Sequence, residues 1–172
     1  AALPPMNGGS GSAAPVLVAE PRGALPRADS VLDRPLDAPV TVTNTADTGA
    51  GSLRQAIISA AAGDTIVFAA GVTGTILLTS GALNVNKNLT IQGPGANVLA
   101  VSGSNLSKVF IISAGMTVTI SGLTVQNGAG NIPAGSGIEN SGNLTLTDAA
   151  VINNGVVGLG GGGIFNNGQA QL

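Results

Sequence analysis

The sequence predicts an all-β fold, a parallel β-helix (β-solenoid) with coils of about 23–29 residues and one α-helix capping its N-terminal end. The first observation is a repeated unit, because Gly-Ile-Glu-Asn at 137–140 recurs as Gly-Ile-Phe-Asn at 163–166. The second is that each copy contains short apolar-Thr-apolar runs broken by Gly, Asn, Ser and Asp, a pattern typical of strands. The third is that no long helical period separates these runs, so turns must connect the strands.

Equivalent residues of successive copies are expected to stack along the axis of the solenoid. The run Leu-Thr-Leu at 144–146 aligns with Val-Thr-Ile at 118–120 and with Leu-Thr-Ile at 89–91. Two neighbouring inward columns follow from this alignment: Leu89, Val118, Leu144 and Ala170 in one, and Ile91, Ile120, Leu146 and Leu172 in the other. Because strand side chains alternate between faces, the residues between the columns point outward. These are Thr90, Thr119, Thr145 and Gln171.

Residues 1–39 precede the repeats and hold seven of the nine prolines. Such a segment buries too little apolar surface to offset the entropy of ordering it, which predicts a flexible arm or linker. An alternative is that two short apolar runs add as strands to an exposed sheet edge of this copy or of another. These runs are Val16-Leu17-Val18 and Val31-Leu32.

Residues 40–63 are predicted to form a first strand, at 41–45, and the capping helix, at 53–62. Ser52 and Gln55 have the spacing of a capping box, in which each residue satisfies a backbone N–H of the other. Gly63 follows as the residue that ends the helix. The apolar face of the helix is expected to cover the first coil and to protect its edge. It consists of Leu53, Ala56, Ile57 and Ala60, and leaves Arg54, Gln55 and Ser59 to solvent.

Residues 64–172 are predicted to form the coils. Strands are expected at 65–68, 75–78, 83–85, 89–91, 98–101, 109–112, 118–120, 123–125, 144–146, 150–152 and 163–165. Turn asparagines lie one repeat apart, Asn127 with Asn153 and Asn140 with Asn166. We expect their amides to form hydrogen-bonded ladders along the axis. A second interpretation is that they are turn formers which tolerate a left-handed backbone.

Five ordered segments resemble bacterial extracellular right-handed parallel β-helix proteins, in particular pectate-lyase-like solenoids of the "CSLREAI" type found in surface and adhesin-like proteins. The segments are VTNTADTGAGSLRQAI (42–57), GDTIVF (63–68), NLTIQGPG (88–95), VTISGLTV (118–125) and NLTLT (143–147). The resemblance covers roughly residues 40–172 and implies a right-handed solenoid with a structural or adhesive role. Gly51 stands where many relatives carry Cys, which removes a disulfide or metal role at this position.

Composition excludes several classes of function. Only 8% of the residues are charged, the net charge is −2, and no arginine follows Arg54. A nucleic-acid-binding protein would need a basic stripe to neutralise phosphates. No apolar run approaches the roughly 18 residues of a membrane-spanning helix. The sequence starts without a secretion signal, as expected if one had been removed, and we expect an extracellular protein.

Catalysis, a metal site and a cofactor are not expected. The ionisable residues from 64 onwards are Asp64, Lys87, Lys108, Glu139 and Asp148. Polysaccharide lyases and glycosidases need clustered carboxylates, whereas Glu139 aligns with Phe165 and Asp148 with Gly122. A solenoid that binds or cleaves polysaccharides through Asp148 or Glu139 stays an alternative.

Asp47, in Thr-Ala-Asp-Thr-Gly, is interpreted as a hydrogen-bonded turn residue, because a lone carboxylate among hydroxyls is a poor calcium site. The outward hydroxyls of Thr117-x-Thr119-x-Ser121 lie over those of Thr145-x-Thr147. This array gives a second alternative, an ice-binding solenoid.

The last coil is expected to lack a cap, since residue 172 falls within a coil and no helix or charged strand follows it. An open edge over an apolar core favours pairing. We therefore expect either further coils of a longer chain or head-to-tail self-association. The predicted contact residues are Ile164, Phe165 and Leu172, together with Val16, Leu17 and Val18. The function predicted from the whole sequence is a non-enzymatic cell-surface or matrix scaffold, adhesin-like; end-to-end stacking into a filament is one form of assembly that the open coil allows, and glycans are candidate partners.

Overall fold

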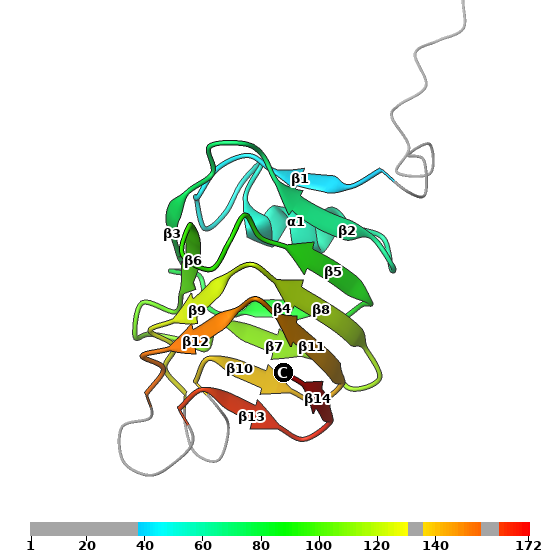
Figure 1. Cartoon of the computed structure of the whole chain (residues 1–172), viewed down its shortest axis with the longest axis vertical. Coiled ribbons are helices and arrows are strands. Elements are labelled where there is room, and N and C mark those ends of the chain that lie inside the picture. The colour runs from blue at the N-terminus through cyan, green and yellow to red at the C-terminus, as the bar shows by residue number, and fades with distance from the viewer. Residues whose placement is uncertain (1–37, 131–135, 156–161) are drawn as a thin grey trace, which may run out of the picture. The chain divides into compact units, whose positions relative to one another are not determined.

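Three parallel sheets make up the fold in the computed structural model, which describes residues 38–130, 136–155 and 162–172. Successive strands pass from one sheet to the next and then start a new coil, giving a β-solenoid of about 5 turns. Figure 1 shows the strands of each sheet stacked one below the other. The predicted fold class is confirmed.

The sheets are named here by their strands in order along the solenoid. Sheet A consists of β1 (Val40–Val42), β2 (Thr65–Phe68), β5 (Leu89–Gln92), β8 (Thr117–Ser121), β11 (Asn143–Thr147) and β14 (Gln169–Gln171). Sheet B consists of β3 (Gly74–Leu77), β6 (Leu99–Ser102), β9 (Thr124–Gln126) and β12 (Ala150–Ile152). Sheet C consists of β4 (Leu83–Val85), β7 (Phe110–Ile112), β10 (Ile138–Asn140) and β13 (Ile164–Asn166).

The register between coils follows the repeat in the sequence. Leu89 pairs with Val118, Val118 with Leu144, and Leu144 with Ala170. The neighbouring column joins Ile91, Ile120 and Leu146. The members of these columns from β5, β8 and β11 are buried, so the predicted inward columns are confirmed for these three strands. Leu172 is 82% exposed beyond the last paired residue of β14.

The core fills the space between the three sheets, as expected for strands that each present one apolar face to the interior. Sheet B contributes the column Ile76, Val101 and Val125, and sheet C contributes Leu83, Phe110 and Ile138. All six side chains are at most 1% exposed. Phe110 is the largest of the fully buried side chains.

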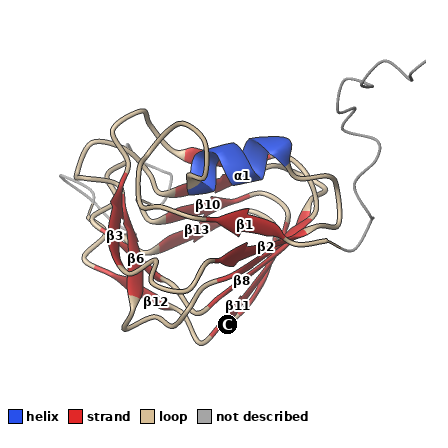
Figure 2. Ribbon diagram, turned by 90° about the horizontal axis from the view of Figure 1, so that it is seen from above, coloured by secondary structure: helices blue, strands red, loops and turns tan. Residues whose placement is uncertain are grey.

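Helix α1 (Leu53–Ser59) lies between β1 and β2 in the chain and over the N-terminal end of the solenoid (Figure 2). Leu53, Ala56 and Ile57 are buried against the core, as predicted. Ser52 Oγ accepts the N–H of Gln55 at 3.2 Å, which is half of the expected capping box. The other half is absent, because the N–H of Ser52 donates to the carbonyl of Gly49 in the preceding turn and the Gln55 side chain is exposed.

The helix ends earlier than predicted, at Ser59 rather than at residue 62, with Ala60 as its C-cap. Two groups from outside the helix compete for its next backbone groups. Asp64 Oδ2 accepts the N–H of Ala61 at 2.7 Å, and Lys87 Nζ donates to the carbonyl of Ala60 at 2.9 Å. These bonds replace the intrahelical bonds that a continued helix would need.

Three predicted strands match the observed ones, at 65–68, 83–85 and 150–152, and all the others except the first differ by one residue at one or both ends. The first strand is Val40–Val42 rather than 41–45, because the N–H groups of Thr43 and Asn44 bond to the carbonyl of Gly51 and form a loop. Two strands were not predicted, β10 and β14. Both lie where the repeat aligns them with strands of other coils.

Two glycines allow the backbones of neighbouring coils to approach at the corner between sheets A and B. Gly122 has φ +60, and a Cβ built on it would lie 2.5 Å from the carbonyl oxygen of Gly93. A Cβ on Gly93 would lie 2.2 Å from the carbonyl oxygen of Gly122. Since backbone cannot yield as a flexible side chain can, a side chain at either position would push the two coils apart.

Residues 1–37 lie outside the described residues, and with them Val16, Leu17 and Val18. The predicted contribution of the arm to an exposed edge therefore stays a prediction. The chain divides at residues 33 and 34 into two units, and the solenoid belongs entirely to the second.

Candidate functional site

The most extensively hydrogen-bonded charged group among the described residues is the carboxylate of Asp47, in the loop between β1 and α1. Its Oδ1 accepts from Arg54 Nη2 at 2.7 Å and from Arg54 Nε at 3.1 Å. Its Oδ2 accepts from the backbone N–H of Thr79 at 3.0 Å and of Ser80 at 2.7 Å, and from the Thr79 hydroxyl at 3.1 Å. Both oxygens are therefore occupied by donors, and the carboxylate is held as a structural anion.

Arg54 extends this contact to the first full coil. Its Nη1 donates to the carbonyl of Ala82 at 2.8 Å, and its Nη2 donates to the carbonyl of Gly81 at 2.6 Å. The side chains of Arg54 and Asp47 are only 16% and 8% exposed. We call Asp47, Arg54 and the backbone of residues 79–82 the cap clasp. Arg54 was expected to face solvent, and this expectation is wrong because the backbone carbonyls before β4 bind its guanidinium.

The cap clasp controls the ionisation of Asp47. Burial acts to raise the pKa of this carboxyl, but the hydrogen bonds from Arg54, Ser80 and Thr79 outweigh burial and hold the pKa well below its usual range. Asp47 is therefore ionised throughout the neutral and mildly acidic range. A group of this kind stabilises the fold, whereas a general acid or base would need a pKa near the working pH.

A second cation holds the other end of α1. Lys87, in the turn after β4, donates from Nζ to the carbonyls of Ile58 at 3.0 Å and Ala60 at 2.9 Å. A cation at this end of a helix is favourable, because the last carbonyls have no intrahelical partner. Arg54 binds the residues just before β4 and Lys87 follows β4, so α1 lies along this strand and is bound at both of its ends.

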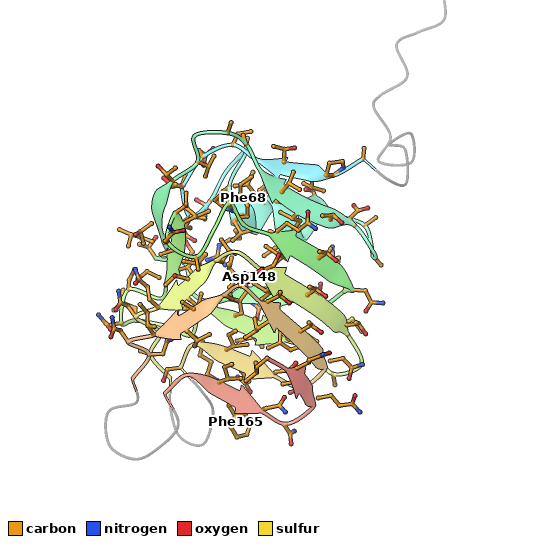
Figure 3. The ribbon with its side chains drawn as sticks, in the orientation of Figure 1. Phe68, Asp148 and Phe165 are labelled. Atoms are coloured by element: carbon orange, nitrogen blue, oxygen red, sulfur yellow. The ribbon has the colours of Figure 1, made fainter. Side chains whose placement is uncertain are left out.

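The carboxylates of the enzyme alternative do not converge. Glu139 lies on β10 of sheet C and forms an ion pair with Lys108. Asp148 lies in the turn between β11 and β12, at the corner of sheets A and B (Figure 3). It is exposed, has φ +50, and makes no hydrogen bond or ion pair with the described residues. Glu139 and Asp148 therefore lie on different sides of the solenoid and could not act together as the acid and the nucleophile of a glycosidase.

The described residues include no group of three His, Cys, Asp or Glu side chains placed to hold a metal ion. In the same part of the chain, no helix is long and apolar enough to cross a membrane.

The outer face of sheet A carries no charge, and most of its side chains can form hydrogen bonds; Val67 on β2, in register with Gln92, is apolar. One row joins Thr65, Thr90, Thr119, Thr145 and Gln171 in register across five strands. The row on one side of it contains Gln92, Ser121 and Thr147, and the row on the other side contains Thr117, Asn143 and Gln169. We call these three rows the threonine face. The prediction that Thr90, Thr119, Thr145 and Gln171 form one row between the inward columns is confirmed.

Asparagines form a ladder at one of the two predicted positions. Asn140 is fully buried, and its Nδ2 donates to Asn166 Oδ1 at 2.6 Å, one coil away. The same amide donates to the carbonyls of Gln169 at 2.8 Å and Gly142 at 3.2 Å, and its oxygen accepts the N–H of Gly142 at 3.0 Å. Asn140 thus ties its own turn to the next coil.

The predicted ladder between Asn127 and Asn153 is wrong, since no hydrogen bond joins these two described residues. Both have a left-handed backbone, with φ 50 and φ 52. They therefore act as turn formers, which was the second interpretation of these asparagines. Asn127 Nδ2 contacts Ser102 Oγ at 3.4 Å instead. The bonds to the preceding coil come from Asn154, whose Nδ2 donates to the carbonyl of Val125 and whose Oδ1 accepts the N–H of Gly128.

Replacing Asn140 by Ala is expected to lower the free energy of unfolding by about 1–3 kcal/mol, because the buried N–H of Gly142 loses its acceptor. Replacing Asn166 by Ala removes the same bond between the two side chains but leaves Asn140 with its other partners. We expect this control to cost about 1 kcal/mol or less. Urea-induced unfolding of both variants tests the difference, and equal losses would contradict it.

Three of the residues predicted at the assembly edge, Ile164, Phe165 and Leu172, lie on the last described coil. Ile164 packs against the core, and Phe165 lies half-buried on the outer side of β13 (Figure 3). In the register of sheet C, Phe165 follows Ile111 and Glu139. Ile164 and Phe165 therefore point to opposite faces of one sheet and do not form a single patch.

Comparisons with protein-family models, with curated protein sequences and with solved structures give no match. The architecture itself, a parallel β-solenoid with a capped N-terminal end, is what the structure establishes.

Proposed function

We propose that this chain is a non-catalytic extracellular scaffold, a rigid solenoid module of a cell-surface or matrix protein. The resemblance of its five segments to "CSLREAI"-type β-helix proteins supports this role. The module would hold attached segments at a fixed distance and present its lateral faces to the surroundings, as extended solenoids do.

The observation that carries the proposal is that most charged side chains of the described residues bind other parts of the fold. Asp47 and Arg54 form the cap clasp, Lys87 binds the end of α1, and Lys108 pairs with Glu139. Asp64 accepts the N–H of Ala61 next to the helix end. Among the charged side chains of the described residues, these six have structural partners, and Asp148 alone is exposed and unpaired.

End-to-end stacking on the N-terminal coil is not part of this proposal. α1 lies along β4 and is bound to the residues before and after this strand. A second copy could pair with β4 only by displacing the helix. A cap of this kind protects the edge of a solenoid from other chains.

Two measurements test the scaffold. Antibody labelling of intact source cells should detect the chain at the surface, and mild protease treatment of the cells should remove the signal. Incubation of the purified chain with polygalacturonate and neutral glycans should release neither unsaturated products nor reducing ends. Release that disappears in Asp148→Asn or Glu139→Gln would establish the enzyme alternative instead.

Sedimentation at neutral pH, with electron microscopy of the same sample, tests whether α1 prevents copies of the chain from stacking end to end. We expect no regular fibres from the purified chain. Fibres one solenoid wide would show that the cap does not prevent stacking, and would return head-to-tail assembly to the function of the chain.

A further inference from the structure

The threonine face has a regular arrangement that a scaffold does not require. Thr65, Thr90, Thr119 and Thr145 repeat from strand to strand without interruption. Hydroxyl or amide groups flank Thr119 and Thr145 on both sides, whereas Val67 lies beside Thr65 on β2. The inward residues beside the central threonines, such as Ile120 and Leu144, are buried and anchor the strands in the core. The position of each threonine is thus set by the register of the solenoid.

The spacing of these side chains follows from β geometry. Neighbouring strands lie roughly 4.8 Å apart, and alternate residues of one strand lie roughly 6.6 Å apart. Thr is branched at Cβ, so its χ1 angle is restricted and its hydroxyl and methyl groups have nearly fixed directions. The result is one row of Thr hydroxyl and methyl groups, from Thr65 to Thr145, with a constant repeat along the solenoid. On β8 and β11, hydroxyl and amide side chains lie on both sides of this row at the second repeat.

The chemistry of the face restricts its partner. No residue of the three rows is charged, which argues against phosphates, acidic polysaccharides and other ions as ligands. None of the residues in the three rows is aromatic, so the rows offer no platform on which a sugar ring could stack. A second protein copy would bury many hydroxyl and amide groups at a cost unless each found a hydrogen-bond partner.

An uncharged lattice of hydrogen-bonding groups with similar repeats is a better match, and the surface of an ice crystal is such a lattice. We propose that the threonine face binds ice, with Thr90, Thr119 and Thr145 at its centre. Water molecules ordered by the hydroxyl and methyl groups would merge with the crystal surface and stop its growth there. This activity goes beyond the scaffold role and does not depend on it.

The test uses the whole purified chain and measures thermal hysteresis and inhibition of ice recrystallisation. We expect both activities in the wild type. Thr119→Tyr and, separately, Thr90→Tyr place a bulky ring in the middle row and should abolish them. Thr75→Tyr is the matched control, because Thr75 lies on β3 of sheet B outside the threonine face, and it should keep the wild-type activity.

Circular dichroism and the unfolding temperature establish that each variant is folded, and two positions are used so that one misfolded variant does not decide the result. Absence of hysteresis and of recrystallisation inhibition in the wild type overturns the proposal. An equal loss in Thr75→Tyr also overturns it, because the activity would then not belong to this face. Co-sedimentation with insoluble cellulose that Thr119→Tyr abolishes would assign the face to a neutral polysaccharide.

Discussion

Replacing Asp47 by Asn is expected to lower the free energy of unfolding by about 3–5 kcal/mol, which is the usual effect of breaking a buried ion pair by removing one partner. The amide has one oxygen, whereas both carboxylate oxygens of Asp47 accept hydrogen bonds. Either orientation of the amide therefore turns its NH2 group toward donors, Arg54 on one side or Ser80 on the other. Urea-induced unfolding followed by circular dichroism measures the loss.

The matched control is the same substitution at Asp148. Its side chain is exposed and unpaired among the described residues, and its left-handed backbone suits Asn as well as Asp. We expect Asp148→Asn to change the free energy of unfolding by less than about 0.5 kcal/mol. A loss at Asp47 as small as the change at Asp148 would show that the cap clasp contributes nothing measurable to stability.

The same pair of proteins predicts a dependence on pH. The pKa of Asp47 is lowered in the folded state, so its contribution to stability is fully present above the ordinary pKa of about 3.9 and is lost as the pH falls toward the folded-state pKa. Asp47→Asn has no such contribution to lose. The difference in the free energy of unfolding between the two proteins should therefore shrink from about pH 5 to about pH 2. A constant difference would mean that Asp47 is not the group that titrates.

Replacing Phe110 by Ala is expected to cost about 3–5 kcal/mol, as for other large-to-small substitutions in well-packed cores. Phe110 lies on the inner side of β7, fully buried, between Leu83 of the coil before and Ile138 of the coil after. Both neighbours belong to hydrogen-bonded strands, which limits how far the core can collapse into the cavity. Thermal and urea-induced unfolding measure the effect.

Phe165→Ala is the control for this substitution. Phe165 lies on β13 of the same sheet, on the outer side and only half-buried. We expect the free energy of unfolding to fall by about 1 kcal/mol or less. A half-buried side chain contributes little hydrophobic free energy on folding, and its removal leaves no closed cavity. Equal losses at the two positions would contradict the assignment of inner and outer faces in sheet C.

The repeat in the sequence predicted the register of the solenoid better than the pattern within each coil predicted its strands. Leu144 and Val118 pair as expected, because a column of apolar residues fixes which face points inward. Strands β10 and β14 were not predicted from their own residues, Ile-Glu-Asn and Gln-Ala-Gln, which contain too few apolar side chains. Pairing with neighbouring coils determines these strands, and only the repeat carries that information.

The cap clasp could not be predicted from local rules. Arg54 lies on the polar side of the helix pattern, and its partners at residues 81 and 82 are backbone carbonyls, which leave no trace in side-chain composition. One signal was available: Asp47 and Arg54 are opposite charges only seven positions apart in a chain that has few charges. Such a pair next to a helix start is a reason to expect a bound arginine.

The two asparagine pairs show that recurrence after one repeat does not by itself predict a hydrogen bond between the two side chains. Asn140 and Asn127 both recur after one repeat, yet only Asn140 bonds to its equivalent. The difference lies in the backbone, because Asn127 adopts a positive φ and Asn140 belongs to a strand with its side chain inside. The sequence has no separate signal for these two conformations.

The binding of α1 at both ends of β4 has a consequence for how the chain folds. Apart from the bonds between Asp47 and Arg54, the bonds of the cap clasp and of Lys87 join residues 27–33 positions apart, and each coil pairs with the next over a similar separation. Such contacts need a loop closure of similar, moderate length for each coil, so the coils can form one after another. We expect the capped first coil to act as the nucleus, on which later coils add in order as the chain leaves the ribosome.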